Sequence, residues 1–94
     1  MPYNETKRKT ELLDKWITIY SRHTANTRFG SKEVYTATFE GADNTKPENY
    51  FDFFGSVVLD AELDTEVLPI TIRIRTARSK NGTEYYVYEK KSNA

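Results

Sequence analysis

The side chains most able to bind a ligand lie in the last third of the chain, where basic and aromatic residues alternate. Arg73 and Arg75 precede an Asn81-Gly82 pair, and Tyr86 and Tyr88 follow it. Asn-Gly between two alternating runs is the strongest short-range signal for a two-residue hairpin turn. Arginines pair with phosphates and tyrosines stack on bases, so this combination is typical of a surface that binds single-stranded nucleic acid.

A two-residue turn at Asn81-Gly82 fixes which residues face each other across the hairpin. It pairs Arg78 with Tyr85 and Ile74 with Glu89. Because side chains of a strand alternate between two faces, the hairpin then has an apolar face and a binding face. The apolar face, assigned to the core, carries Ile70, Ile72, Ile74, Tyr85 and Val87. The binding face carries Arg73, Arg75, Tyr86, Tyr88 and Lys90.

A second group of candidates lies in the polar segment 22–32, which we predict to be a loop. Phe29 stands beside Arg28 at its tip, and Lys32 follows. Loop tips are usually polar, so a phenylalanine there indicates either a ligand contact or a loop that folds back to bury it. Lys80, next to the predicted turn, is a further phosphate contact.

Ordinary structural roles remain open for the hairpin residues. Tyr88 can pack across the strands on Arg75, and Arg73 and Arg75 can be edge charges that prevent aggregation. Trp16 is expected in the core more than at a ligand, with stacking on a base as the alternative.

The zero net charge hides an uneven distribution along the chain. Residues 1–39 hold seven basic and four acidic residues, a net charge of +3. Residues 40–68 hold one basic and eight acidic residues (−7), and residues 69–94 hold six basic and two acidic residues (+4). If the two basic segments meet in the fold, the protein has a positive face that suits a phosphate-bearing partner.

The elements that must position these residues are mostly strands. Alternating runs predict strands over 16–21, 33–39 and 50–59, a fourth from Pro69, and a fifth that closes the hairpin. A short helix is expected to end near Lys15, and the acidic segment 60–66 is a loop or one helical turn. Residues 1–94 form one domain, with residues 1–5 and 91–94 frayed. We predict an all-β fold, a small five-stranded barrel with at most one or two short helices.

The composition excludes several functions. The chain has no cysteine and a single histidine, His23, so it offers no disulfide framework and no cysteine-based metal site. Neither a phosphate-cradling glycine loop nor a nucleophile elbow is present. The mean hydropathy is −0.76, with no membrane-length apolar run and no apolar leader in residues 1–15. We expect a cytoplasmic protein that is not an enzyme and needs no cofactor or metal.

Two stretches resemble small phage- or plasmid-type single-stranded DNA-binding proteins of the OB-fold class. They are Trp16-Ile-Thr-Ile with Arg28-Phe-Gly-Ser-Lys-Glu-Val-Tyr35, and Ile72-Arg-Ile-Arg with Ser79-Lys-Asn-Gly-Thr-Glu-Tyr-Tyr-Val-Tyr88. The resemblance covers about half of the chain. It implies an OB-like barrel, a role in DNA replication, and a cleft rimmed by two loops. The rim positions are Arg28, Phe29, Lys32 and Ser79 to Gly82. Members of this family usually have a helix before the fourth strand. Segment 60–66 of this chain, which lies at that place, is too short and too acidic for such a helix.

Two functions follow as hypotheses. The first is sequence-tolerant binding of single-stranded DNA, with RNA as the other polymer and a replication or recombination protein as a further partner. The second is a small protein-binding module or inhibitor of phage or mobile-element origin, because aromatics with arginine also make interface hot spots. The sequence leaves the oligomeric state and the choice between DNA and RNA open.

Overall fold

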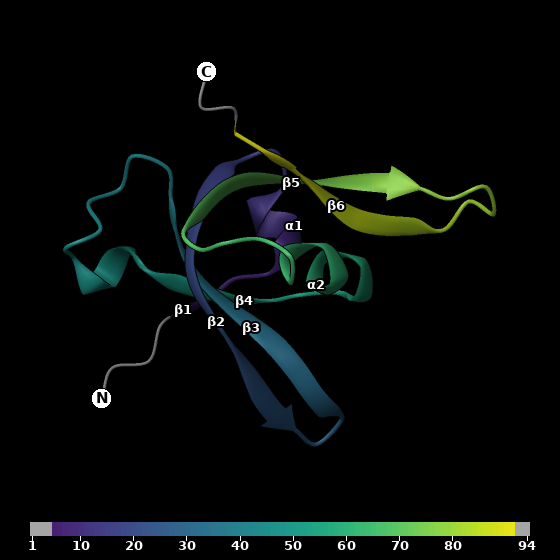
Figure 1. Ribbon diagram of the computed structural model, residues 1–94, viewed down its shortest axis with the longest axis horizontal. Coiled ribbons are helices and arrows are strands. Elements are labelled where there is room, and N and C mark those ends of the chain that lie inside the picture. Colours follow the sequence, from purple (N-terminus) through teal and green to yellow (C-terminus); the bar gives the residue numbers. More distant parts are fainter. Residues whose placement is uncertain (1–4, 92–94) are drawn as a thin grey trace.

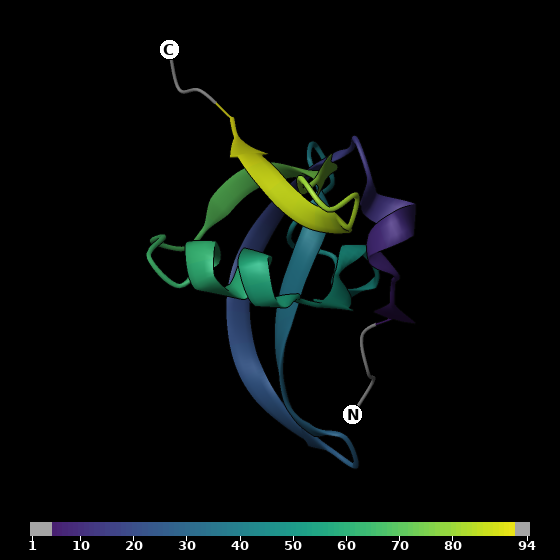
Figure 2. The same cartoon turned by 90° about the vertical axis from the view of Figure 1, so that its right-hand side faces the viewer.

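Alternating apolar side chains build the centre of the sheet. Ile17 and Ile19 alternate with polar residues on one strand, Ile72 and Ile74 do the same on its neighbour, and all four are fully buried. A computed structural model describes residues 5–91 of the chain (Figures 1 and 2). The strands are β1 (Glu5–Thr6), β2 (Trp16–Thr27), β3 (Gly30–Phe39), β4 (Phe51–Phe54), β5 (Ile70–Arg78) and β6 (Glu84–Lys90). The helices are α1 (Lys9–Leu12), α2 (Val57–Leu63) and a 3-10 helix, η1 (Pro47–Asn49).

The strands form one six-stranded sheet in the order β1-β4-β3-β2-β5-β6. Only β1 and β4 run parallel. The fold is therefore dominated by strands and has short helices, as predicted, but it differs from the predicted five-stranded barrel. The sixth strand is β1, which adds to the edge of β4. Within residues 5–91 no ladder joins β6 to either β1 or β4, so the sheet is not closed.

The core lies on the inner side of the curved sheet, where the helices supply the remaining cover. Leu12 of α1 and Leu59 and Leu63 of α2 are almost completely buried there. Phe51 and Phe53 of β4 join them, while Phe54 at the end of that strand is 38% exposed. Burial of these side chains is the main stabilising contribution to the fold.

The hairpin of β2 and β3 is longer than expected and projects from the body (Figure 1). The prediction of a loop over 22–32 is wrong, because the ladder continues to the pair Thr27 and Gly30. In this projecting part many residues are exposed, so the sequence has no apolar alternation there to mark it as strand. The predicted loop tip is reduced to Arg28 and Phe29.

The predicted third strand over 50–59 is also wrong in its second half. The strand ends at Phe54, and after Gly55 and Ser56 the chain forms α2. Gly55 is not a bulge within a strand: a Cβ there would lie 1.8 Å from Asp60 Oδ1 and 2.7 Å from Tyr35 Cε2. The residue lets the strand pass directly into a helix packed against it. The helix covers much of the stretch expected to be a loop or a single turn.

The closing hairpin shows the predicted tight turn with a register shifted by one residue. Gly82 has φ +82° as expected, and its N–H donates to Ser79 O at 2.9 Å. The loop holds three residues, 80–82, so Arg78 pairs with Glu84 and Ile74 with Tyr88. A glycine with positive φ after a turn is the usual ending of a three-residue hairpin loop.

This shift overturns the predicted binding face. A one-residue slip moves every side chain of one strand to the other face. Tyr86 and Tyr88 therefore share the inner face with Ile74 and pack against the core, while Arg73 and Arg75 lie on the outer face.

The two predicted frayed ends fall mostly on residues 1–4 and 92–94, which lie outside the described residues. Of the rest, Glu5 pairs with Phe51, and the Lys91 N–H donates to Thr71 O at 3.0 Å. The helices among residues 5–91 are all too short to cross a membrane.

Candidate nucleic-acid interface

Two adjoining grooves share Lys9 and Phe54 as a common wall, and the first of them is bordered by the tip of the β2–β3 hairpin. We call them together the basic groove. Its first half, of about 350 Å³, is lined by Lys9, Thr27, Phe29, Lys32, Phe54 and Gly55. Its second half, of about 520 Å³, is lined by Thr6, Lys7, Arg8, Lys9, Thr10, Phe54 and Tyr86. Basic and aromatic side chains interleave here without an acidic residue in either lining.

Phe29 is presented by a turn whose backbone is fixed on both sides. Thr27 Oγ1 accepts a hydrogen bond from the Phe29 N–H at 3.1 Å and donates one to Gly30 O at 2.7 Å. Gly30 has φ +109°, which side-chain-bearing residues rarely adopt. The Phe29 ring is 83% exposed, so the alternative in which the loop folds back to bury it is wrong.

Lys9 stands at the junction of the two halves. Its Nζ donates to Phe54 O at 2.9 Å and to Gly55 O at 3.4 Å, and it lies 5.3 Å from the centre of the Tyr86 ring. Burial lowers the pKa of Lys9; Asp60 opposes this shift and the charge of Lys32 adds to it.

The basic groove holds cations that no carboxylate neutralises. Arg8 and Lys32 in its linings, and Arg28 outside them, make no ion pair with any acidic side chain of residues 5–91. Lys7 is the exception, with Glu5 at 3.4 Å. Unpaired cations beside exposed aromatic rings suit a ligand that carries phosphates and bases.

The two arginines of the closing hairpin that were predicted to bind phosphate are instead paired with carboxylates of the protein itself. Arg73 is bound to Glu89 and lies over the Trp16 ring, 4.9 Å from its centre. Arg75 lies 3.6 Å from Glu89 and 3.7 Å from Asp14. This outer face is therefore largely neutralised by its own carboxylates.

The other predicted residues of this hairpin are separated from one another. Tyr88 covers the core, and burial, helped by the charges of Glu66 and Glu62, raises its pKa. Lys80 lies at the far tip of the β5–β6 hairpin. The structure thus brings Phe29, Lys32 and Tyr86 to the linings of the basic groove and leaves Arg28, Arg73, Arg75, Lys80 and Tyr88 outside them.

Several groove residues were missed by sequence reasoning. Lys7, Arg8 and Lys9 form the longest basic run of the chain, a signal that was available. Phe54 lies in the middle of the predicted strand over 50–59, and the earlier end of β4 leaves it 38% exposed.

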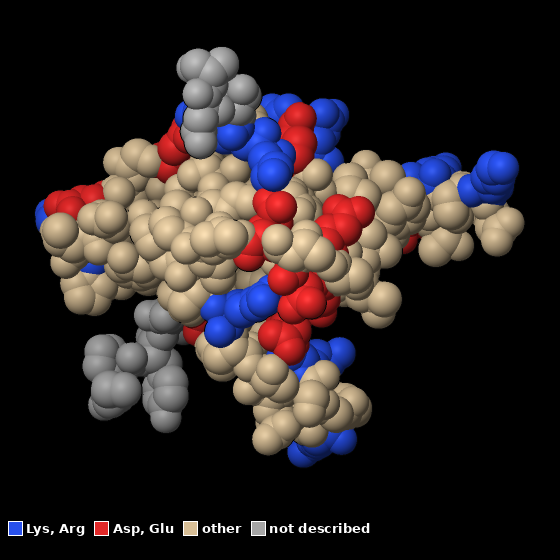
Figure 3. All heavy atoms as spheres, in the orientation of Figure 1, with Lys and Arg blue, Asp and Glu red and all other residues tan. Residues whose placement is uncertain are grey.

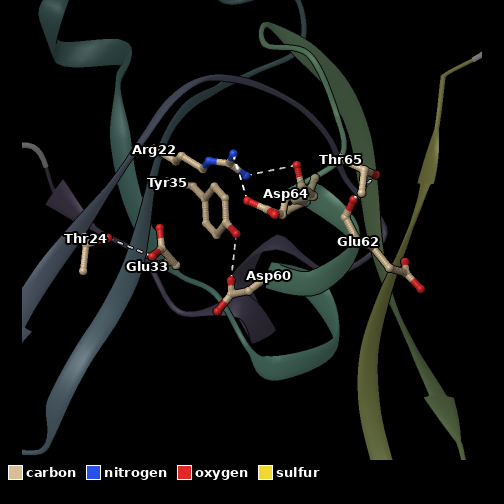
Figure 4. A network of polar contacts seen from close by, with 9 residues as sticks. Arg22, Thr24, Glu33, Tyr35, Asp60, Glu62, Asp64 and Thr65 are labelled. Atoms are coloured by element: carbon tan, nitrogen blue, oxygen red, sulfur yellow. Dashed lines mark hydrogen bonds and ion pairs between the residues drawn. The ribbon is translucent and has the colours of Figure 1, made fainter.

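A polar network fixes the projecting hairpin to α2 (Figure 4). Tyr35 donates to Asp60 Oδ1 at 2.7 Å, and Arg22 donates to Leu63 O at 3.1 Å and pairs with Asp64 at 3.2 Å. Burial, the hydrogen bond to Asp60 and nearby charges raise the pKa of Tyr35 well above its usual range. The network adjoins the basic groove at Gly55, which lines the groove and lies directly against Asp60 and Tyr35.

The charges are sorted by position on the surface. Figure 3 shows acidic side chains gathered at the centre of one face, around α2, with basic side chains near the ends of both projecting hairpins. Asp60, Glu62, Asp64 and Glu66 belong to or follow α2. A phosphate backbone would be repelled from this face and drawn to the basic groove.

Residues 5–91 contain no group of three or more histidine, aspartate or glutamate side chains placed to hold a metal ion. Comparison with known proteins gave no match to a family model, a curated protein or a solved structure. The arguments for function therefore come from the geometry and charge of this chain.

Proposed function

We propose that the protein binds single-stranded DNA in the basic groove. The observation that carries this proposal is the combination of the exposed Phe29 ring with the unpaired Lys32 in one lining, continued by Arg8 and Tyr86 in the next. A stacked base contributes about 1–3 kcal/mol and does not depend on sequence, so binding is sequence-tolerant.

The strand order supports the proposal. Five strands in the order β4-β3-β2-β5-β6, with α2 between β4 and β5, agree with the arrangement that the OB-fold resemblance implies. The groove borders the loop between β2 and β3, as expected for that class. A role in the replication of phage or plasmid DNA, with a replication protein as partner, belongs to the same proposal.

The residues that line the basic groove define a path for the bound DNA strand. It passes from Phe29 along Lys32, crosses the wall of Lys9 and Phe54, and leaves between Arg8 and Tyr86. The DNA does not continue over the acidic face around α2, because the carboxylates there repel its phosphates.

Titration of labelled oligo-dT at two salt concentrations tests the proposal. Phe29→Ala should weaken binding by about 1–3 kcal/mol with an unchanged salt slope. Lys32→Gln should weaken binding and lower the slope of log affinity against log salt by about 0.7. Lys80→Gln, a matched lysine at the other hairpin tip, should leave both quantities unchanged. Equal losses in Lys80→Gln and Lys32→Gln would place binding outside the groove, and a parent that binds no oligo-dT at low salt would reject the function.

A protein-binding module is the second candidate, favoured by a different surface. Val57 and Val67 are each 87% exposed, one at the start of α2 and the other shortly after it. Apolar side chains beside acidic ones suit a basic protein partner. A protein that acts only through that surface would not bind oligo-dT even at low salt.

A further inference from the structure

Lys9 directs two of its three hydrogen-bond donors into the protein. An ammonium group carries three N–H donors. Two of them reach the carbonyl oxygens of Phe54 and Gly55, and the group also lies over the Tyr86 ring. Moving the ammonium group away toward a phosphate would break these contacts.

The contacts of Lys9 also join two strands that no ladder links in the described part of the chain. Phe54 ends β4 and Tyr86 belongs to β6, and no ladder links these two strands within residues 5–91. Lys9, from α1, touches both. Phe54 and Tyr86 are at the same time the aromatic walls of the second half of the basic groove.

We infer that Lys9 is a positioning residue: it holds Phe54 and Tyr86 in place as walls of the basic groove and does not itself contact phosphate. Its effect on DNA rests on the proposed function, whereas its effect on the two rings does not. Lys32, in the same groove and without a carboxylate partner among residues 5–91, is the lysine left free for phosphate.

The surroundings of Lys9 agree with this role. The charged groups that act on it are Asp60 of α2 and Lys32 of β3, one attractive and one repulsive. A second cation so close is tolerated because the carbonyl oxygens of Phe54 and Gly55 solvate the ammonium group. The same carbonyl oxygens lie at the end of β4, where the Phe54 side chain is partly exposed.

Lys9→Met separates positioning from charge, because methionine keeps an unbranched apolar chain and removes the ammonium group. Without DNA, NMR spectra of Lys9→Met should show shifted signals for the Gly55 amide and the Tyr86 ring, while Lys32→Met leaves both in place. Unshifted signals in a folded Lys9→Met protein would overturn the inference whether or not the protein binds DNA.

Oligo-dT titration then gives the second readout. Lys9→Met should lose roughly 5- to 150-fold in affinity, the value of one base stack, with the salt slope of the parent. Lys32→Met should lower that slope by about 0.7. Lys9→Arg can still donate to both carbonyl oxygens and stack on Tyr86, so it should restore most of the affinity. A slope lowered in Lys9→Met as in Lys32→Met would mean that Lys9 contacts phosphate. Failure of the parent to bind would reject the proposed function and leave the NMR result to decide the role of Lys9.

Discussion

At the scale of single residues, Gly55 is the position where the smallest change has the largest expected effect. Its missing Cβ leaves the space in which Asp60 and Tyr35 meet. Gly55→Ala should destabilise the fold by about 1–3 kcal/mol, because the added methyl group overpacks a closed site. Urea unfolding measures this. The neighbouring Ser56→Ala is the control, expected to be neutral or stabilising since the buried Ser56 Oγ has no hydrogen-bond partner within residues 5–91. A Gly55→Ala protein as stable as the parent would contradict the close packing described.

Tyr35 gives a prediction that depends on pH. Its hydroxyl is buried against Asp60, so Tyr35→Phe should cost about 1–2 kcal/mol at neutral pH by leaving that carboxylate without its donor. The raised pKa means that the folded state favours the protonated tyrosine. This stabilisation is complete below the ordinary tyrosine pKa of about 10 and is lost as the pH rises above it. The stability difference between parent and Tyr35→Phe should therefore shrink in alkaline solution, as measured by urea unfolding at several pH values. A difference that grows with pH would contradict the assignment.

At the scale of elements, the closing hairpin determines which tyrosine belongs to folding and which to binding. Tyr88→Ala should lower stability by about 1–2 kcal/mol, since the ring is half-buried against the core. Tyr86 also packs against the core, so Tyr86→Ala should lower stability as well, but it alone should weaken oligo-dT binding, because its ring lines the basic groove. Thermal unfolding and oligo-dT titration of both variants separate the two roles. Tyr85→Ala, on the outer face, is the control that should change neither. A loss of stability in Tyr85→Ala, with Tyr86→Ala and Tyr88→Ala as stable as the parent, would indicate the register first predicted from a two-residue turn.

The elements also show where sequence reasoning succeeds. The buried isoleucines of β2 and β5, the hairpin at Asn81-Gly82 and the positive φ of Gly82 were predicted because each depends on local chemistry or on plain alternation. The register of the closing hairpin was not predicted, because a two-residue and a three-residue loop share the same Asn-Gly signal. The length of the β2–β3 hairpin was missed because much of its projecting part is exposed and polar. The site was predicted in part: Phe29, Lys32 and Tyr86 share a groove, but Lys9 and Phe54 enter it only through contacts distant in sequence.

At the scale of the whole molecule, a neutral chain sorts its charge into separate surfaces. Acidic side chains surround α2, ion pairs neutralise the outer face near Arg73 and Arg75, and unpaired cations remain in the basic groove. Arg75→Ala should accordingly leave the affinity for oligo-dT and its salt slope close to those of the parent. Losing about 0.7 from the slope would mean that the outer face carries phosphate.

The central claim is that single strands bind in the basic groove, and amide chemical-shift mapping during titration with oligo-dT tests it most directly. The predicted result is a continuous set of perturbed amides along Phe29, Lys32, Gly55, Lys9 and Tyr86, with those of Arg73 and Arg75 unchanged. Perturbations centred on the outer face, or none at low salt, would contradict it.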